Sequence, residues 1–180
     1  MGVVNIMKEF VIGDLHFWDD NIRRFENRPW ANVKEMNDAL IFNWNCMVSA
    51  NDKVFVVGDF IGMDYCTVED AIKILNQLNG HIVLIAGNHD KPYLDFYRKH
   101  GVEVIEFPIV YHNFWIISHE PMYVTVNSPY ANIFAHVHNN PMYNTVSSRS
   151  YCVSAERIGY KPILLKDAID AVLELVSKER

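Results

Sequence analysis

The stretch IVLIAGNHD, residues 82–90, places an apolar run directly before a polar turn. An apolar run of this length, bounded by turn-forming residues, is typical of a buried β-strand. We therefore expect a strand over residues 82–86 that ends at Gly87-Asn88-His89-Asp90. A glycine at this point lets the chain turn sharply and lets a ligand approach the backbone.

Two earlier apolar runs end in the same way. Residues 9–12 lead into Gly13-Asp14, and residues 53–57 lead into Gly58-Asp59. Ligands of open α/β sheets bind beyond the carboxyl ends of the strands. Three such endings in succession therefore predict a shared rim of carboxylate and amide oxygens.

The segments between and after these runs predict the rest of the fold. Apolar residues at three- and four-residue steps predict a helix over 33–48 behind the cap Asn32, and a second behind Thr67 that ends at Asn79-Gly80. The second helix is expected to bury Val68, Ala71, Ile72, Leu75 and Leu78. A short helix from Pro92 toward His100 follows, then strands over 102–107, 114–118, 133–135, 151–154 and 162–165, and a helix over 167–177.

This order predicts parallel β–α units in the first half and hairpin-like pairing in the second. The fold class is therefore α/β, with two packed mixed β-sheets flanked by helices. No repeat or flexible linker interrupts residues 1–180, so a single domain is expected.

Composition limits the function. The chain has 180 residues, 50% of them hydrophobic and 21% charged, as in ordinary globular proteins. A net charge of -6 argues against a broad nucleic-acid-binding face, although bound metals could still attract a phosphate. Cys46, Cys66 and Cys152 form no CxxC pair and are expected to be reduced thiols. Without a secretory signal or a spanning apolar run, a cytoplasmic protein with no membrane partner is expected.

Histidines complete the polar rim in three short motifs: Asp14-Leu15-His16, Ser118-His119-Glu120-Pro121 and His136-Val137-His138. Residues two apart in an extended segment face the same way, which would aim Asp14 and His16 at one point, and likewise His136 and His138. Each motif alone has an ordinary explanation as a turn or a surface pair. Together with Gly58-Asp59 and Gly87-Asn88-His89-Asp90 they make five ordered motifs at strand ends, which favour a metal site. The candidate ligands are Asp14, His16, Asp59, Asn88, His119, His136 and His138.

This ligand set mixes oxygen and nitrogen, which suits Mn, Fe, Zn or similar ions better than Ca or Mg. Seven side chains are too many for one tetrahedral ion, whereas two ions bridged by one carboxylate account for them.

The ordered set resembles the calcineurin-like metallophosphoesterase superfamily, whose pattern is Asp-x-His, Gly-Asp, Gly-Asn-His-Asp/Glu, a His after a strand, and Gly-His-x-His. A narrower resemblance, to small stand-alone bacterial and phage phosphoesterases, rests on His16-Phe17, Asn21-Ile22, Phe25, Arg28-Pro29, Met36 and Asn43-Trp44-Asn45. The resemblance implies an αββα sandwich.

The resemblance also implies roles for the site residues. Asp14, His16 and His138 would hold the first ion, and Asn88, His119 and His136 the second, with Asp59 bridging both. The two divalent ions would be Mn, with Fe, Zn or Ni as alternatives. His89 would protonate the leaving oxygen or stabilise its charge, with Asp90 or Asp64 as its carboxylate partner.

The chain departs from the family pattern in four places. Ala135 replaces the glycine of the last motif, and Trp18-Asp19-Asp20 stands where the subgroup often has a second histidine. The Asp-Arg-Gly extension of protein phosphatases is absent after Asp59, which disfavours protein substrates. Tyr151-Cys152-Val153 replaces a common Asn-Val pair.

The expected function is hydrolysis of a phosphodiester or phosphomonoester of a small substrate, with nucleotides among the candidates, by attack of a metal-bridging hydroxide. Hydrolysis of another bond is disfavoured by the His89 motif. A non-catalytic metal-binding scaffold is the alternative from a different class. Candidate phosphate-binding residues are Arg23, Arg24, Arg28 and Arg149, and candidate stacking residues are Trp18, Trp30, Tyr123, Tyr130 and Tyr143; each also has a structural or packing explanation.

Overall fold

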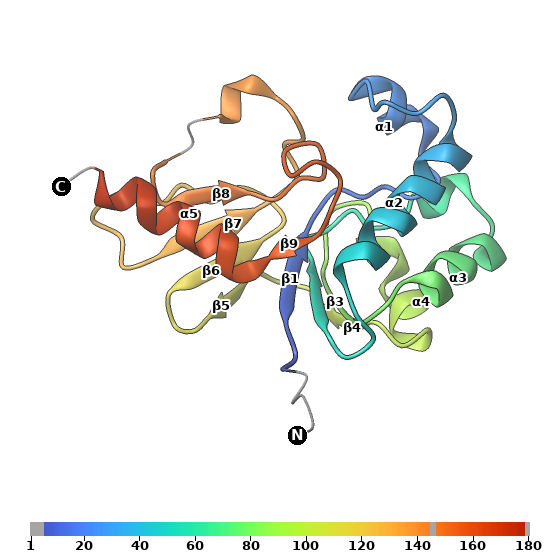
Figure 1. Cartoon of the computed structure of the whole chain (residues 1–180), viewed down its shortest axis with the longest axis horizontal. Coiled ribbons are helices and arrows are strands. Elements are labelled where there is room, and N and C mark those ends of the chain that lie inside the picture. The colour runs from blue at the N-terminus through green and yellow to red at the C-terminus, as the bar shows by residue number, and fades with distance from the viewer. Residues whose placement is uncertain (1–5, 145–146, 179–180) are drawn as a thin grey trace.

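The computed structural model describes residues 6–144 and 147–178, which form two β-sheets and their covering helices (Figure 1). The first half contains β1 (Glu9–Ile12), α1 (Asp20–Phe25), α2 (Val33–Met47), β2 (Lys53–Val56), α3 (Val68–Gln77), β3 (His81–Ile85), α4 (Leu94–Lys99) and β4 (Glu103–Ile105). The second half contains β5 (Ile109–Tyr111), β6 (Trp115–Ser118), β7 (Ala131–Phe134), β8 (Ser150–Cys152), β9 (Ile163–Leu164) and α5 (Leu165–Ser177). Short 3-10 turns lie at Met63–Tyr65, Lys91–Tyr93 and Pro141–Tyr143.

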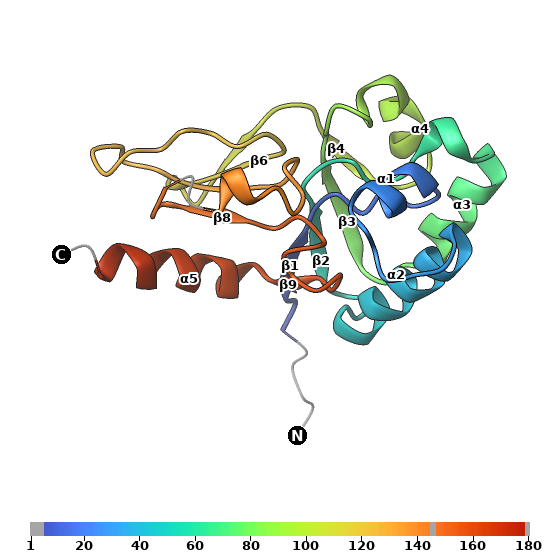
Figure 2. The same ribbon diagram turned by 90° about the horizontal axis from the view of Figure 1, so that it is seen from above.

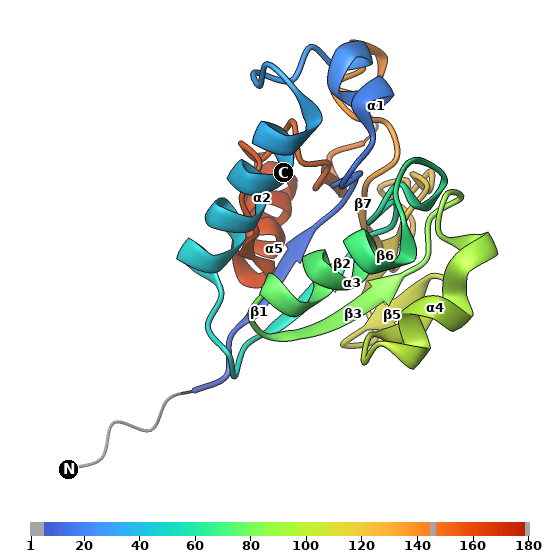
Figure 3. The same ribbon diagram turned by 90° about the vertical axis from the view of Figure 1, so that its right-hand side faces the viewer.

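The strand order of the first sheet explains where its helices lie. The order is β4-β3-β2-β1-β9, with β1 to β4 parallel and β9 antiparallel at one edge. Because each crossover from β1 to β4 steps in the same direction, right-handed connections place the helices on one face. Figures 2 and 3 show α2, α3 and α4 together on that side of the sheet. The other face is left for the second sheet.

Alternate residues of the first sheet face two separate cores. Phe10 and Ile12 of β1 pack toward α2 and α3, whereas Val11 packs toward the second sheet with Ile117 and Ile133. Burial on both faces explains why these strands are continuous apolar runs rather than alternating ones. Helix α5 contacts β1, β9 and β8 and closes the second core (Figure 1). The predicted α/β fold with two packed mixed sheets flanked by helices is therefore confirmed.

Both predicted helix caps are present. The side chain of Asn32 accepts a hydrogen bond from the Glu35 N–H at 2.9 Å, and that of Thr67 accepts one from the Asp70 N–H at 3.1 Å. Helix α1 was not predicted, because its six residues are too few to show apolar periodicity. It begins after Asp19, whose side chain caps α1 by accepting hydrogen bonds from the N–H groups of Asn21 and Ile22 in its first turn.

Two other expectations were wrong in detail. The second sheet, β5-β6-β7-β8, has one antiparallel pair, β5–β6, while β6–β7 and β7–β8 are parallel. The long segments after β6 and β7 allow the chain to return to the same end of the sheet, which a short hairpin cannot do. On α3, Ile74 is buried whereas Val68 is 51% exposed, because Val68 lies in the first turn, beyond the edge of the packed face.

The described part of the chain contains no helix that is both long and apolar enough to cross a membrane. The cysteines Cys46, Cys66 and Cys152 are all free thiols.

Candidate metal centre

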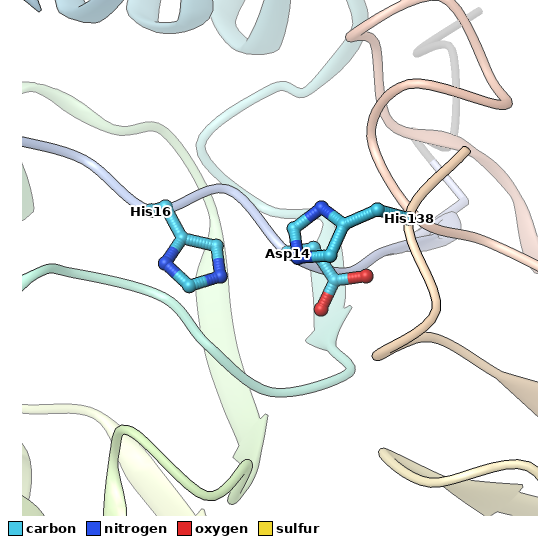
Figure 4. Close-up of side chains that lie close together, drawn as sticks. All are labelled: Asp14, His16 and His138. Atoms are coloured by element: carbon cyan, nitrogen blue, oxygen red, sulfur yellow. The ribbon is translucent and has the colours of Figure 1, made fainter. Parts of the chain in front are cut away.

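The first group of ligand-type side chains joins the segments after β1 and β7. Asp14 and His16 follow β1, and His138 follows β7, about 120 residues later in the chain; Figure 4 shows the three side chains close together. One ligand atom from each lies within 4.8 Å of the other two. This separation is short enough for a single cation to contact all three.

The second group lies beside the first. It contains Asp59 after β2, His119 after β6 and His136 after β7, again with ligand atoms within 4.8 Å of one another. Asn88, after β3, joins them because its Oδ1 lies 3.1 Å from Nε2 of His119. The four residues come from strands of both sheets, so this group forms only when the sheets pack together.

Asp59 connects the two groups. Its Oδ2 lies 3.5 Å from Nε2 of His16 in the first group and 3.3 Å from Nε2 of His119 in the second. A carboxylate in this position can reach a cation in either group. The structure therefore brings together all seven residues that the sequence selected as ligands.

The backbone at these residues is unusual. Asp14, His16, Asp59, His136 and His138 all have φ between 47° and 70°, in the left-handed region. Asp14 and His16 do share one group, as expected, but through a tightly turned backbone beyond β1 rather than an extended segment. The expectation that His136 and His138 aim at one point was wrong, since they lie in different groups. A non-glycine residue in this region costs roughly 1–2 kcal/mol, and such strain concentrates at functional sites.

Two glycines make room for the ligands. Gly58 has φ +77°, and a Cβ there would collide with the imidazole of His119. A Cβ at Gly87 would collide with the carboxylate of Asp59. The Gly-Asp and Gly-Asn-His-Asp motifs thus let two strand ends approach the second group closely.

Buried atoms without partners support a cation in the first group. Oδ2 of Asp14 and Nε2 of His16 are buried, and neither has a hydrogen-bond partner in the described part of the chain. Leaving a buried polar atom unpaired costs about 1–3 kcal/mol, and more for a charged group. A cation between these atoms would satisfy both, so the residues fit a metal.

Asp59 raises the pKa of a histidine in each group. Burial disfavours the charged form of His119, but the Asp59 carboxylate outweighs it and raises the pKa of His119 to about 9. Burial likewise opposes charge on His16, yet Asp19 and Asp59 raise its pKa to about 9. Burial alone would raise the pKa of Asp59, but His119 and His16 hold it well below its usual value.

Burial dominates at Asp14, in contrast. It raises the pKa of this carboxyl, although His138, His119 and His16 oppose the shift. Without metal, the site therefore holds extra protons that an incoming cation would have to displace.

Three acceptors that the sequence did not reveal orient the imidazoles. Oδ2 of Asp19 lies 3.5 Å from Nδ1 of His16, and Oε1 of Glu156 lies 3.2 Å from Nδ1 of His138. The carbonyl oxygen of Val57 lies 2.9 Å from Nδ1 of His119. Such partners leave Nε2 free for a metal and set the ring orientation. Glu156 lies in no recognisable motif, and Asp19 caps a helix that the sequence did not predict.

Arg28, a candidate phosphate-binding residue, is buried and binds other parts of the protein. Its guanidinium is buried, 2.6 Å from Oε1 of Glu156, and it donates to the carbonyl oxygens of Asp14 and Leu15. Burial alone would raise the pKa of Glu156, but His138 and Arg28 outweigh it and lower this pKa to about 2. Arg28 thus supports the first group from behind.

The other candidate arginines also have protein partners. Arg23 donates to Asp20 and to the carbonyl oxygen of Trp30, and Arg24 pairs with Asp20. Arg149 donates to the carbonyl oxygen of Ser128 at 3.1 Å. Among the aromatic candidates, Trp18 and Trp30 pack against the first core, whereas Tyr123 is 82% exposed.

His89 lies beside the first group with its side chain exposed. Its ring centroid is 5.3 Å from that of His16, and its backbone N–H donates to Oδ1 of Asp59 at 3.0 Å. Within the described residues its imidazole has no hydrogen bond to Asp90 or Asp64. Asp64 instead accepts a hydrogen bond from the Tyr93 hydroxyl.

Asp90 is fully buried and binds the backbone. Its carboxylate accepts hydrogen bonds from the N–H groups of Asp59, Phe60 and Gly87, and from the Tyr97 hydroxyl. Burial and the neighbouring Asp59 raise its pKa, while the backbone N–H groups oppose this. The predicted catalytic residue Asp90 therefore has the contacts of a group that positions the Asp59 loop.

Comparison with protein families matches residues 7–173 to the calcineurin-like phosphoesterases. The uncharacterized protein MJ1445 of Methanocaldococcus jannaschii is 36% identical over 180 residues, covering 97% of this chain and 94% of that protein. A protein of unknown function from Aquifex aeolicus, AQ665, has a similar fold, with a TM-score of 0.72 at 22% identity over 92% of this chain and 98% of that chain. The Pseudomonas putida nuclease MPE has a TM-score of 0.51 at 22% identity over 72% of this chain and 61% of its own.

Proposed function

Because the chain belongs to the calcineurin-like phosphoesterase family, in which metal-dependent hydrolysis of phosphoesters is the general activity, we propose that it is a dinuclear phosphohydrolase of small phosphate esters. The observation that carries the proposal is the position of Asp59. Its carboxylate lies within 3.5 Å of a histidine from each ligand group.

Asp14, His16 and His138 would hold one ion, and Asn88, His119 and His136 the other, with Asp59 shared. Two divalent ions, when bound, supply an activated water molecule and neutralise the charge that develops on the phosphoryl oxygens. Two ions carry +4 against -2 from Asp14 and Asp59, so a phosphate would be attracted. The mixed nitrogen and oxygen donors suit Mn, Fe, Zn or Ni, and of these Mn is the proposed ion.

His89 would supply the proton for the leaving oxygen. Its backbone is held by Asp59 while its imidazole is exposed beside His16, so the ring can contact a substrate bound at the ligand groups. A ring nitrogen that carries a proton in this position can donate it as the ester bond breaks.

The substrate would be a small phosphodiester or phosphomonoester, with nucleotides among the candidates. A net charge of -6 disfavours a broad nucleic-acid-binding face, and Phe60-Ile61-Gly62 stands where protein phosphatases extend the Gly-Asp motif. The structurally similar Pseudomonas putida protein MPE is named a nuclease, which supports including phosphodiesters in the test.

The test combines metal content with hydrolysis. Protein purified without chelator and reconstituted with Mn should bind two ions per chain and hydrolyse bis-p-nitrophenyl phosphate, p-nitrophenyl phosphate or nucleotides. His119→Ala should abolish this activity, whereas His81→Ala, which changes an exposed histidine paired with Glu103, should not. Two bound ions without hydrolysis of any ester in a broad panel would favour the scaffold, and saturation at one ion would contradict the dinuclear site.

A further inference from the structure

A cavity of about 570 Å³ opens directly beside the second ligand group. Asn88 and His119 form part of its wall, so a molecule in the cavity would touch the residues proposed to hold the second ion. The rest of the wall comes from the end of β3, the segment that leads into α4, the segment between β4 and β5, and the end of β6 with the residues after it. Its volume falls in the range of roughly 300–1,000 Å³ that small-ligand sites occupy.

Much of the remaining wall is apolar. It includes Leu94, Phe107, Pro108 and Met122. Phe107 is 75% exposed and Met122 is 40% exposed, so neither side chain is used to fill the protein core. An exposed aromatic ring offers a face for stacking, and a methionine sulfur makes favourable contacts with aromatic rings.

The charges at the rim favour a neutral occupant. Glu106 is paired with Arg98 at 2.5 Å. Lys91 and Glu120, both exposed, add one positive and one negative charge. These charges cancel, so the cavity itself does not select for an ion, and the phosphate would instead be attracted to the metal centre next to it.

From this geometry we propose that the cavity binds the organic group of the phosphoester, and that this group is planar and largely apolar, as an aryl group or a nucleobase is. The proposal rests on the proposed function, since the phosphoryl group must lie at the metal centre. Phe107 is then a specificity-determining residue, which stacks on the planar group while the phosphoryl group is held near Asn88 and His119. A small aliphatic phosphate would leave the cavity unfilled.

Phosphonates test this without hydrolysis, because their P–C bond is not a substrate for ester cleavage. Methylphosphonate, phenylphosphonate and 5′-deoxyadenosine 5′-phosphonate, whose phosphorus is bonded to C5′, would be titrated by calorimetry into the metal-loaded protein. Phenyl or adenosyl phosphonate should bind more tightly than methylphosphonate. A gain for both identifies an aryl site, whereas a gain for the adenosyl compound alone identifies a nucleobase site.

Variants then test whether Phe107 is responsible for the tighter binding of planar phosphonates. Phe107→Ala should weaken binding of the planar phosphonate by between about 5-fold and about 100-fold, the range expected for loss of one aromatic stacking contact, and leave methylphosphonate unchanged. Phe107→Trp should retain the affinity. Phe42→Ala, which removes a phenylalanine 69% exposed on α2, is the matched control and should have no effect.

Hydrolysis of bis-p-nitrophenyl phosphate by the same proteins separates the two hypotheses. If the wild-type protein hydrolyses the diester while Phe107→Ala binds planar phosphonates as well as the wild type, the cavity assignment is wrong and the proposed function stands. If planar phosphonates depend on Phe107 but no ester is hydrolysed, the cavity is a binding site and the proposed function is wrong.

Discussion

The backbone N–H of Asp59 donates a 2.7 Å hydrogen bond to Oδ2 of Asp90. Asp59 lies between both ligand groups, so Asp90 determines where the shared carboxylate lies. The Asp90 carboxylate also accepts a hydrogen bond from the N–H of Gly87, the residue before Asn88. One buried side chain thereby aligns the ends of β2 and β3.

Asp90→Asn should therefore destabilise the protein before it affects chemistry. An amide has one acceptor oxygen, so backbone N–H groups that Asp90 now satisfies would lose their partner, at about 1–3 kcal/mol for a buried unpaired donor. Chemical denaturation should show this loss, and calorimetry should show weaker metal binding. Asp64→Asn, at the other carboxylate considered for His89, should change stability by less than about 0.5 kcal/mol. Unchanged stability with a large loss of rate would instead support a catalytic Asp90.

Asp59→Asn should weaken metal binding in both groups, because its carboxylate reaches His16 and His119. His138→Ala should weaken mainly the first group, where it lies with Asp14 and His16. Metal titrations of the two variants would resolve one affected step for His138→Ala and two for Asp59→Asn. Two ions bound to Asp59→Asn with wild-type affinity would rule out a bridging role.

Arg28→Ala should destabilise the fold by about 3–5 kcal/mol, the usual cost of removing one partner from a buried ion pair. Glu156 would lose its guanidinium partner, and its contact with His138 would become less well positioned. Arg24→Ala, at an exposed arginine, should change the free energy of unfolding by less than about 1 kcal/mol. A stable Arg28→Ala protein with a raised KM would mean that Arg28 contacts the substrate after all.

Metal binding should release protons near neutral pH. In the metal-free protein the pKa values of His16 and His119 are about 9, raised from 6.5, so both imidazoles hold a proton at pH 7. A metal binds the neutral ring, so about two protons should leave, and affinity should fall as the pH falls. Calorimetry in buffers of different ionisation enthalpy measures this number. His119→Ala should lower it by about one, and pH-independent binding between pH 6 and 9 would contradict the assignment.

The same pKa shifts predict how the metal-free protein responds to pH. Because the folded-state pKa values of His16 and His119 are raised, their contribution to stability is full below about pH 6.5 and is lost as the pH rises through about 9. Denaturation of the chelator-treated protein at several pH values would test the direction. Stability that rises over this interval would contradict it.

His89→Ala should retain both metals and the fold, since the imidazole is exposed, but lose rate by ~10²–10⁴-fold for substrates with poor leaving groups. The loss should shrink for p-nitrophenyl esters, which need little protonation. His100→Ala, at a histidine that packs on Phe96 away from the centre, is the control. Equal losses for good and poor leaving groups would indicate stabilisation of charge or positioning instead of proton donation.

Local signals in the sequence determined most of the strands, the main helices and the seven ligand candidates. The apolar runs before Asp14, Asp59 and Asn88 are long enough to identify buried strands, and strand ends meet at one edge of a parallel sheet for simple geometric reasons. The caps Asn32 and Thr67 act within three residues, so they too can be read locally.

Only the tertiary structure decided the strand pairing of the second sheet and the residues that surround the ligand groups. Whether β6, β7 and β8 run parallel depends on the path of long connecting segments, which no residue pattern specifies. Arg28 and Glu156 meet across 128 positions of the chain, and Phe107 meets His119 only around a cavity. Contacts of this kind depend on how the two sheets pack. A sequence pattern of a few residues does not say which distant residues will lie close together in the fold.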